Sequence, residues 1–213
     1  MIETLAIEGR AEVESLLSSL PAAAALARIE HLFGVLPLLE TFFEPEPASE
    51  GKLGSLGLFT PTPELRWGSS AIEGEASGAG LRLRGRVRIA SPISDASIVL
   101  VRLDGPEHRL AWIDHAAPGI EKRGLWLSFQ DTATDHVSRP VTPAPGSELF
   151  RCLEAYAEVW ALAAAICAGN GARALRRAAR SIGFSSSQLV ALDITGLEIE
   201  AELALLAARG PRN

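Results

Sequence analysis

A stretch near the middle of the chain, residues 81–103, alternates apolar and cationic positions. The apolar positions are Leu81, Leu83, Val87 and Ile89, and the cationic positions are Arg82, Arg84, Arg86 and Arg88. A period of two is typical of a β-strand with one face in a core and the other in water. Pro92 and Asp95 then indicate a turn, and the run at 98–103, rich in β-branched residues, predicts a second strand. The arginine row predicts a solvated sheet face, with Glu73 and Glu75 as candidate ion-pair partners.

The patterns on either side divide the chain into three parts. Residues 1–50 have helical spacing, with helices predicted at 7–20, stopped before Pro21, and at 22–33, ended by Gly34. Residues 51–135 carry recurrent glycine and proline turn signals, and strands are predicted at 65–70, 80–89, 97–103, 109–114 and 124–129. Residues 146–210 return to helical spacing, with a long helix at 147–180 and another at about 188–209.

Together these patterns predict an α+β protein. We expect short N-terminal helices, a central antiparallel β-barrel or sandwich, and a C-terminal antiparallel helical pair. Polar, proline-containing connectors at 44–51 and 132–145 separate the three parts.

Composition and charge narrow the class of protein. The 213 residues are 47% hydrophobic and 22% charged, which is ordinary for a globular chain. A net charge of −6 argues against a nucleic-acid partner, because neutralising phosphates needs a basic surface. Cys152 and Cys167 would lie roughly 22 Å apart on one helix, too far for a disulfide, which fits a reducing compartment. No signal-like N-terminus and no apolar run of about 20 residues is evident, so we expect a cytoplasmic protein without a membrane span.

Common catalytic and metal-binding motifs are missing from the sequence. The four histidines are scattered, with no spacing typical of metal ligands, so we expect no metal site. Asp114-His115 and Asp135-His136 are adjacent acid–imidazole pairs, but no nucleophile elbow completes a serine triad. The sequence also has no phosphate-binding loop and no dinucleotide fingerprint.

The order of the parts and several local motifs resemble the acyl-CoA dehydrogenase family of flavoproteins. In the central strand, Gly85 is followed by Arg-Val-Arg-Ile-Ala-Ser at 86–91 and by an apolar strand from Ala96, as in the family's middle domain. Upstream, GLFTP at 57–61 and Gly68-Ser69 are similar to a degraded Leu-Thr-Glu-Pro…Gly-Ser motif. Downstream, IDHAAPGI at 113–120 is similar to the family's strand and Pro-Gly-Val segment. Residues 158–175 and 185–208 resemble the first helices of its C-terminal domain.

The resemblance implies a cofactor, a substrate and a set of site residues. The cofactor would be FAD, bound by this chain or shared with a partner, and the substrate an acyl-CoA of fatty-acid metabolism. Thr60, Ser69 and Ser91 match positions at the flavin, where hydrogen bonds to the ring edge tune its electronics. Arg180 lies where a shortened Arg-x-x-Phe-Gly segment would reach a neighbouring subunit's flavin phosphates. Glu158 matches the catalytic base of a minority of members, which takes the α-proton of the thioester.

Each of these residues also has a plainer interpretation. Thr60 and Ser91 precede prolines and are ordinary turn formers. Glu158 lies off the apolar stripe of its helix and would then face solvent, and Glu154 competes with it for the catalytic position. Arg180 ends a cationic stripe with Arg173, Arg176 and Arg177, which stabilises a helix C-terminus through the helix dipole.

The chain also departs from the family. Its N-terminal helical part is far shorter, and the last C-terminal helices, which carry the catalytic glutamate in most members, are missing. Ile89 stands at the flavin-facing Trp position, and Pro61 replaces the motif's Glu. We therefore interpret the chain as a reduced subunit that acts in acyl-CoA α,β-dehydrogenation with a fuller partner, in a homo- or hetero-oligomer. The alternatives are a small self-sufficient oxidoreductase that uses Glu158, and a non-catalytic binding or scaffold protein that retains the fold without FAD chemistry.

Overall fold

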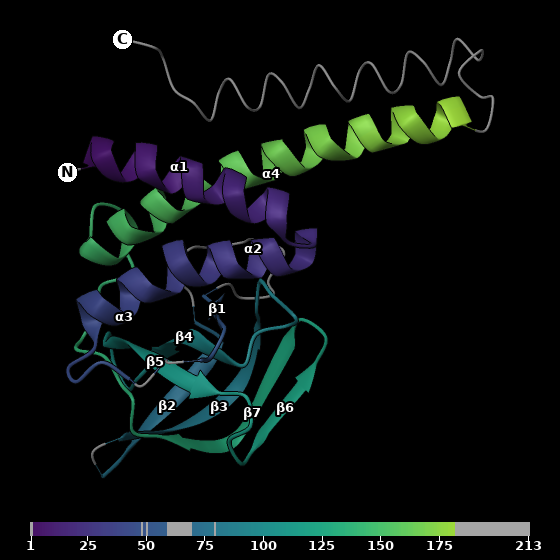
Figure 1. Ribbon diagram of the computed structural model, residues 1–213. Helices are drawn as coiled ribbons and strands as arrows, with labels where there is room; N and C mark the ends of the chain where they lie inside the picture. Colours follow the sequence, from purple (N-terminus) through teal and green to yellow (C-terminus); the bar gives the residue numbers. More distant parts are fainter. Residues whose placement is uncertain (1, 48, 50, 59–69, 79, 182–213) are drawn as a thin grey trace. The chain divides into compact units, whose positions relative to one another are not determined.

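The structure, a computed structural model, describes residues 2–47, 49, 51–58, 70–78 and 80–181 (Figure 1). The described chain divides into two compact units. One comprises residues 27–156, and the other comprises residues up to 26 together with those from 157 onward. The first unit contains a β-sheet with helical turns beside it, whereas the second is helical.

The helices at the N-terminal end confirm the predicted helical pattern and correct one of its boundaries. Helix α1 spans Ile2–Ser19 and α2 spans Ala22–Glu30, with the break at Pro21. The prediction that Gly34 ends the second helix is wrong, because a π-helical turn, η1 (His31–Val35), carries the chain into α3 (Leu36–Phe42). A Cβ at position 34 would lie 3.0 Å from the Leu56 side chain and 3.1 Å from the Tyr156 ring, so glycine serves close packing there.

The described residues form one curled seven-stranded sheet, visible in Figure 1 below α3. Its strands are β1 (Gly54–Gly57), β2 (Ile72–Ser77), β3 (Gly80–Arg88), β4 (Ala96–Arg102), β5 (His108–Asp114), β6 (Ile120–Arg123) and β7 (Trp126–Thr134). The hydrogen-bonded order is β1-β4-β2-β3-β7-β6, and β5 pairs with β4. Four of the predicted strands correspond to β3, β4, β5 and β7, and the one expected at 65–70 lies outside the described residues.

Strand direction agrees with the predicted antiparallel arrangement for most of the sheet, which is nevertheless mixed. The pairs β2–β3, β3–β7, β6–β7 and β4–β5 are antiparallel, whereas β1 and β2 both run parallel to β4. Parallel neighbours need a crossover, and the β2–β3 hairpin lies in the connection between β1 and β4. For the β2–β4 pair, β3 lies in the connection.

The alternating strand behaves as its sequence predicts. Its apolar positions on β3 and just after it are buried, and they pack with β4, β5 and β7 in a core that includes Ile72, Val99, Val101, Ala111, Ile113, Leu127 and Phe129. Its arginines are exposed. Arg82 and Arg84 form ion pairs with Asp131, and Arg86 lies over the Trp126 ring at 4.3 Å. Glu73 and Glu75 lie opposite Arg84 and Arg82 in the β2–β3 register, but the ion pair of Glu73 is with Arg102.

The long C-terminal helix is α4 (Glu148–Ser181), and it continues without a break through Gly169 and Gly171. Both cysteines lie on it as free thiols. The second predicted helix, at 188–209, lies outside the described residues. Two helical segments, Ala22–Phe42 and Glu148–Arg177, are long and apolar enough to cross a membrane by length and composition only. This is weak evidence for a span, because half of the first segment is buried inside the protein, as in the core helix of a globular chain.

Candidate functional site

The turn between β3 and β4 contains Ser91, the predicted site residue whose surroundings the structure describes most fully. Ser91 is 6% exposed, and the two ends of the turn are attached to β1 and to the residue just before it. The Ala90 N–H donates to the Leu56 carbonyl at 3.3 Å, and the Asp95 N–H donates to the Leu53 carbonyl at 2.7 Å. Ile93, at the tip of the turn, is 47% exposed, whereas Ser91 and Ser94 on either side of the tip are buried.

Three buried serines lie behind this turn and connect it to the sheet. The Ser94 hydroxyl lies 2.9 Å from the Ser91 carbonyl oxygen and 3.0 Å from the Ser55 hydroxyl. Ser55 on β1 in turn contacts Ser97 on β4, with 2.7 Å between the two hydroxyl oxygens. Both side chains are fully buried, so these hydroxyls satisfy one another away from water.

His115, just after β5, closes these serines into a ring. Its Nε2 lies 2.7 Å from the Ser97 hydroxyl, and its Nδ1 lies 2.9 Å from the Ser94 carbonyl oxygen. The Lys122 ammonium on β6 donates to the same carbonyl at 2.6 Å and lies 3.2 Å from Nδ1. We call Ser55, Ser94, Ser97 and His115 the serine–histidine ring.

Burial and the nearby Lys122 ammonium favour the neutral form of the His115 imidazole. Burial is the main cause that lowers the pKa of His115 to about 4, and the Lys122 ammonium lowers it further. The Ser94 carbonyl and the carboxylates of Asp114 and Asp95 oppose this shift without cancelling it. Burial also lowers the pKa of Lys122.

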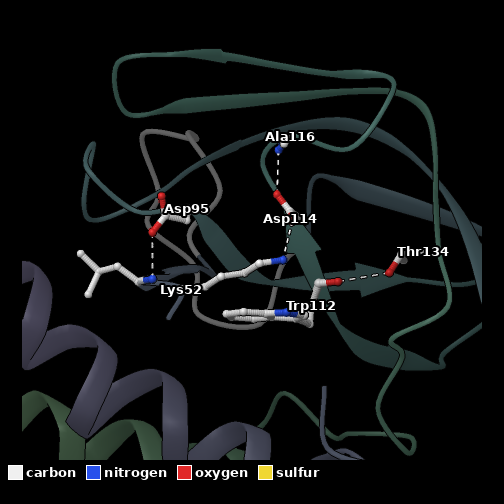
Figure 2. Close-up of polar contacts among 7 residues, drawn as sticks. Lys52, Asp95, Trp112, Asp114, Ala116 and Thr134 are labelled. Atoms are coloured by element: carbon white, nitrogen blue, oxygen red, sulfur yellow. Dashed lines mark hydrogen bonds and ion pairs between the residues drawn. The ribbon is translucent and has the colours of Figure 1, made fainter. Parts of the chain in front are cut away.

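Next to the ring, a pocket of about 360 Å³ opens between Lys52, Trp112, Asp114 and the residues after β7. Figure 2 shows the Lys52 ammonium reaching Asp114, at 2.5 Å, while the other Asp114 oxygen accepts the Ala116 N–H at 2.8 Å. The hydrogen bond from Lys52 is the main cause that lowers the pKa of Asp114. The Asp114 carboxylate thus links the segment just before β1 to the end of β5.

The acid–imidazole pairs in the sequence have different surroundings in the structure. His115 meets a serine, as a triad would require, but Ser97 is fully buried and cannot reach a substrate. Asp135 and His136 lie on the exposed rim of the pocket. Among the described residues, no group of three or more His, Cys, Asp or Glu could hold a metal ion.

The structure does not describe the other predicted site residues in relation to Ser91. Thr60 and Ser69 lie outside the described residues, and Arg180 lies in the last turns of α4. Glu158 is exposed on α4 and belongs to the other compact unit. Ile89, at the position of the family's flavin-facing Trp, is 1% exposed and belongs to the sheet core.

Sequence reasoning did not find the serine–histidine ring. Its members come from β1, the β3–β4 turn, β4 and the end of β5, and no local spacing connects them. The one available signal was His115 beside Asp114, which was considered only as part of a triad.

Comparison with known proteins identifies the fold. No protein-family model and no curated protein sequence matches the chain. Solved structures do match it. Butyryl-CoA dehydrogenase from Megasphaera elsdenii has a TM-score of 0.60 at 16% identity, over 92% of this chain and 61% of that one. Acyl-CoA dehydrogenase from Geobacillus kaustophilus has a TM-score of 0.58 at 16% identity, over 85% and 60%. FkbI, of methoxymalonyl extender-unit biosynthesis, has a TM-score of 0.63 at 15% identity, over 94% and 65%.

These similarities show that the chain has the acyl-CoA dehydrogenase fold, as its sequence predicted. At such low identity they concern the fold alone. The chain spans less than two thirds of the length of each of these three structures.

Proposed function

We propose that this chain is a reduced subunit of an acyl-CoA dehydrogenase-type flavoprotein. It would act in the α,β-dehydrogenation of a fatty acyl-CoA together with a fuller partner subunit, in a homo- or hetero-oligomer. The observation that carries the proposal is the extent of the fold match. Nearly all of this chain aligns with butyryl-CoA dehydrogenase, but little more than three fifths of that enzyme is represented here.

The described residues do not make a complete FAD site. Ser91 is of a suitable type for contact with a flavin ring edge, but its side chain is 6% exposed. Ile89 packs in the sheet core and offers no face for a flavin. In this proposal a partner provides much of the surface that holds FAD, and we derive no catalytic step from this chain's described residues.

The catalytic base is the second function that we assign to the partner. Removing an α-proton from a thioester needs a carboxylate placed in a site from which water is excluded. Glu158 is exposed, as is Glu154 one turn earlier on α4. Glu158 remains the candidate base only for the alternative in which the chain works without a fuller partner.

Exposed apolar side chains give no separate support for a partner surface. The exposed large hydrophobics of the described residues are Leu20, Ile93 and Leu175. They come from the residue after α1, the β3–β4 turn and α4, and single exposed apolar residues are normal on protein surfaces. The proposal therefore depends on the fold match and the incomplete site.

Purification with and without a partner tests the proposal. The full chain is expressed alone and together with an acyl-CoA dehydrogenase from the same genome, and the visible absorption spectrum of each preparation is recorded. We expect the chain alone to be colourless and the co-purified complex to show a flavin band that bleaches when acyl-CoA is added. A yellow, active chain without any partner would favour the self-sufficient enzyme. A colourless, stable monomer that neither captures a dehydrogenase nor responds to acyl-CoA would contradict both and leave the scaffold alternative.

A further inference from the structure

The serine–histidine ring joins the turn that contains Ser91 to three strands. Ser94 belongs to the turn, Ser55 to β1 and Ser97 to β4, and His115 follows β5. All four contacts around the ring are between 2.7 and 3.0 Å. Each hydroxyl has a single proton to donate, so the direction of each hydrogen bond determines how the ring connects the turn to the strands.

The tautomer of His115 determines those directions. The Ser94 carbonyl oxygen, 2.9 Å from Nδ1, can only accept, and the Lys122 ammonium, 3.2 Å from the same nitrogen, can only donate; the shorter contact favours the proton on Nδ1. In the neutral ring Nε2 is then an acceptor, and it receives the Ser97 hydroxyl proton at 2.7 Å. With the proton on Nε2 instead, Nδ1 and the carbonyl oxygen would face each other without a hydrogen between them. With the proton on Nδ1, Lys122 loses the longer of its two contacts here and keeps its hydrogen bond to the Ser94 carbonyl at 2.6 Å.

The remaining hydroxyls follow in order. The Ser97 hydroxyl donates its only proton to His115, so its oxygen accepts the hydrogen bond from the Ser55 hydroxyl. Ser55 in turn accepts from Ser94, whose proton also lies within reach of the Ser91 carbonyl. The imidazole thus orients all three hydroxyls, from β5 back to the turn.

We propose that His115, held as the neutral Nδ1–H tautomer, is a positioning residue that fixes the Ser91 turn through the hydroxyls of Ser97, Ser55 and Ser94. It touches no reacting atom. The groups that face the imidazole are consistent with its neutrality: burial and the Lys122 ammonium lower its pKa, against the weaker opposing effect of Asp114 and Asp95. That the fixed turn serves cofactor contact rests on the proposed function, whereas the ring itself does not.

Nitrogen-15 NMR of the full chain tests the tautomer directly. Long-range proton–nitrogen correlations distinguish the two neutral tautomers, and the His115 signals are identified by their loss in His115→Gln. We expect a protonated Nδ1 and an unprotonated Nε2 that stay unchanged between about pH 6 and pH 8. A proton on Nε2, or titration of His115 within that range, would overturn the proposal.

Substitutions within the ring test its effect on the turn. The reporters are the Ala90 and Asp95 amides, whose hydrogen bonds to β1 and to the residue just before it hold the turn. In Ser97→Ala we expect them to exchange with solvent at least about tenfold faster. Ser138→Ala is the matched control, because Ser138 is equally buried and bonds the Leu110 N–H and the Arg139 carbonyl outside the ring. If Ser97→Ala does not fold, Ser55→Ala breaks the same ring from β1. Wild-type exchange at both reporters in either folded variant would contradict the positioning role.

Measuring flavin in the co-purified complex distinguishes a failure of this inference from a failure of the proposed function. In the co-purified complex, Ser97→Ala should lower the flavin content or shift the absorption maximum, whereas Ser138→Ala should do neither. If the unaltered complex contains no flavin, the proposed function fails while the NMR and exchange results still decide the role of His115. If the unaltered complex contains flavin and Ser97→Ala changes neither property, the ring does not serve cofactor contact.

Discussion

The Glu30 carboxylate accepts a hydrogen bond from the Leu56 backbone N–H at 2.6 Å. The next residue, His31, also accepts a hydrogen bond from β1: its Nδ1 lies 3.0 Å from the N–H of Gly54, two positions before Leu56. Both N–H groups belong to the edge of β1 that does not pair with β4, and both acceptors are buried. Helical side chains therefore satisfy a strand edge that would otherwise be left unpaired.

Two consecutive residues can reach one strand edge because the helix widens at this point. The Leu36 N–H bonds the His31 carbonyl, five residues back, which is the π-helical pattern. Pro37 follows, and it has no N–H to give to the Phe33 carbonyl and would crowd that carbonyl in a regular α-helix. The wide turn relieves this crowding and places Glu30 and His31 over β1.

Glu30→Gln should remove a pH dependence from the stability of the fold. Burial raises the pKa of Glu30 from 4.5 to about 7, although the Leu56 N–H favours the ionised form, and its second oxygen has no partner among the described residues. A raised pKa means that stability is fully present below pH 4.5 and is lost as the pH rises through about 7. We expect urea unfolding at a series of pH values to show that, between pH 4.5 and about 7, the unfolding free energy of wild type falls by on the order of 3 kcal/mol relative to that of Glu30→Gln.

The control for this experiment is Glu40→Gln, an exposed glutamate on α3. Its unfolding free energy should follow the wild-type pH dependence. Parallel curves for wild type and Glu30→Gln would show that Glu30 ionises as freely in the folded chain as in the unfolded one.

His31→Leu should destabilise the chain by about 1–3 kcal/mol, because it leaves the Gly54 N–H buried without an acceptor. His31→Asn keeps an oxygen near the position of Nδ1 and should recover part of that loss. Both are measured by urea unfolding at about pH 7.5, where the histidine is neutral because burial, and then Arg28, lower its pKa. Equal stability of the two variants would mean that the size of the side chain matters there and not its acceptor.

Gly85→Ala should be among the most damaging single-methyl additions to the sheet. Gly85 has φ +128°, and a Cβ there would overlap the Ala71 carbonyl oxygen. We expect a loss of about 3 kcal/mol or more in thermal or urea unfolding. Gly124→Ala is the matched control, since Gly124 also has a positive φ, +59°, but nothing lies within 4 Å of its Cβ position. The Gly124→Ala variant should lose only about 1 kcal/mol of unfolding free energy. Similar losses in both variants would mean that the backbone conformation, and not the overlap with Ala71, causes the destabilisation.

The strands that the sequence predicted are those with a local signal. The alternating apolar and arginine positions of β3 specify its period and its buried face without reference to any other element. In contrast, β1 is Gly-Ser-Leu-Gly, all four residues buried, with no alternation to recognise. It is a strand because β4 pairs with one edge and Glu30 and His31 cap the other, and both partners are distant in the chain. Gly34 shows the converse, because its local signal for a helix end yields to packing against Leu56 and Tyr156.

The candidate site was predictable only as far as its local motifs reach. Ser91 is predicted through its match to a flavin-contact position of the resembled family, in the turn that follows a recognisable strand. Its connection to His115 depends on the register between β4 and β5, which places Ser97 opposite Ile113, two residues before the histidine. Register is set by pairing and burial across the whole sheet, so a single sequence does not reveal which serine meets the imidazole.

Glu158→Gln in the co-purified complex distinguishes the two catalytic alternatives. A base that removes an α-proton acts in the transition state, so its loss would lower kcat by about 100-fold or more. Glu158 is exposed on α4, and the proposed partner carries the base, so we expect kcat and KM to remain within about twofold of wild type. Glu154→Gln, at an exposed position one turn earlier, reports any general effect of changing a charge on this helix. Steady-state turnover with acyl-CoA measures all three proteins. Loss of kcat in Glu158→Gln but not in Glu154→Gln would assign the base to this chain and refute the division of labour between the two subunits.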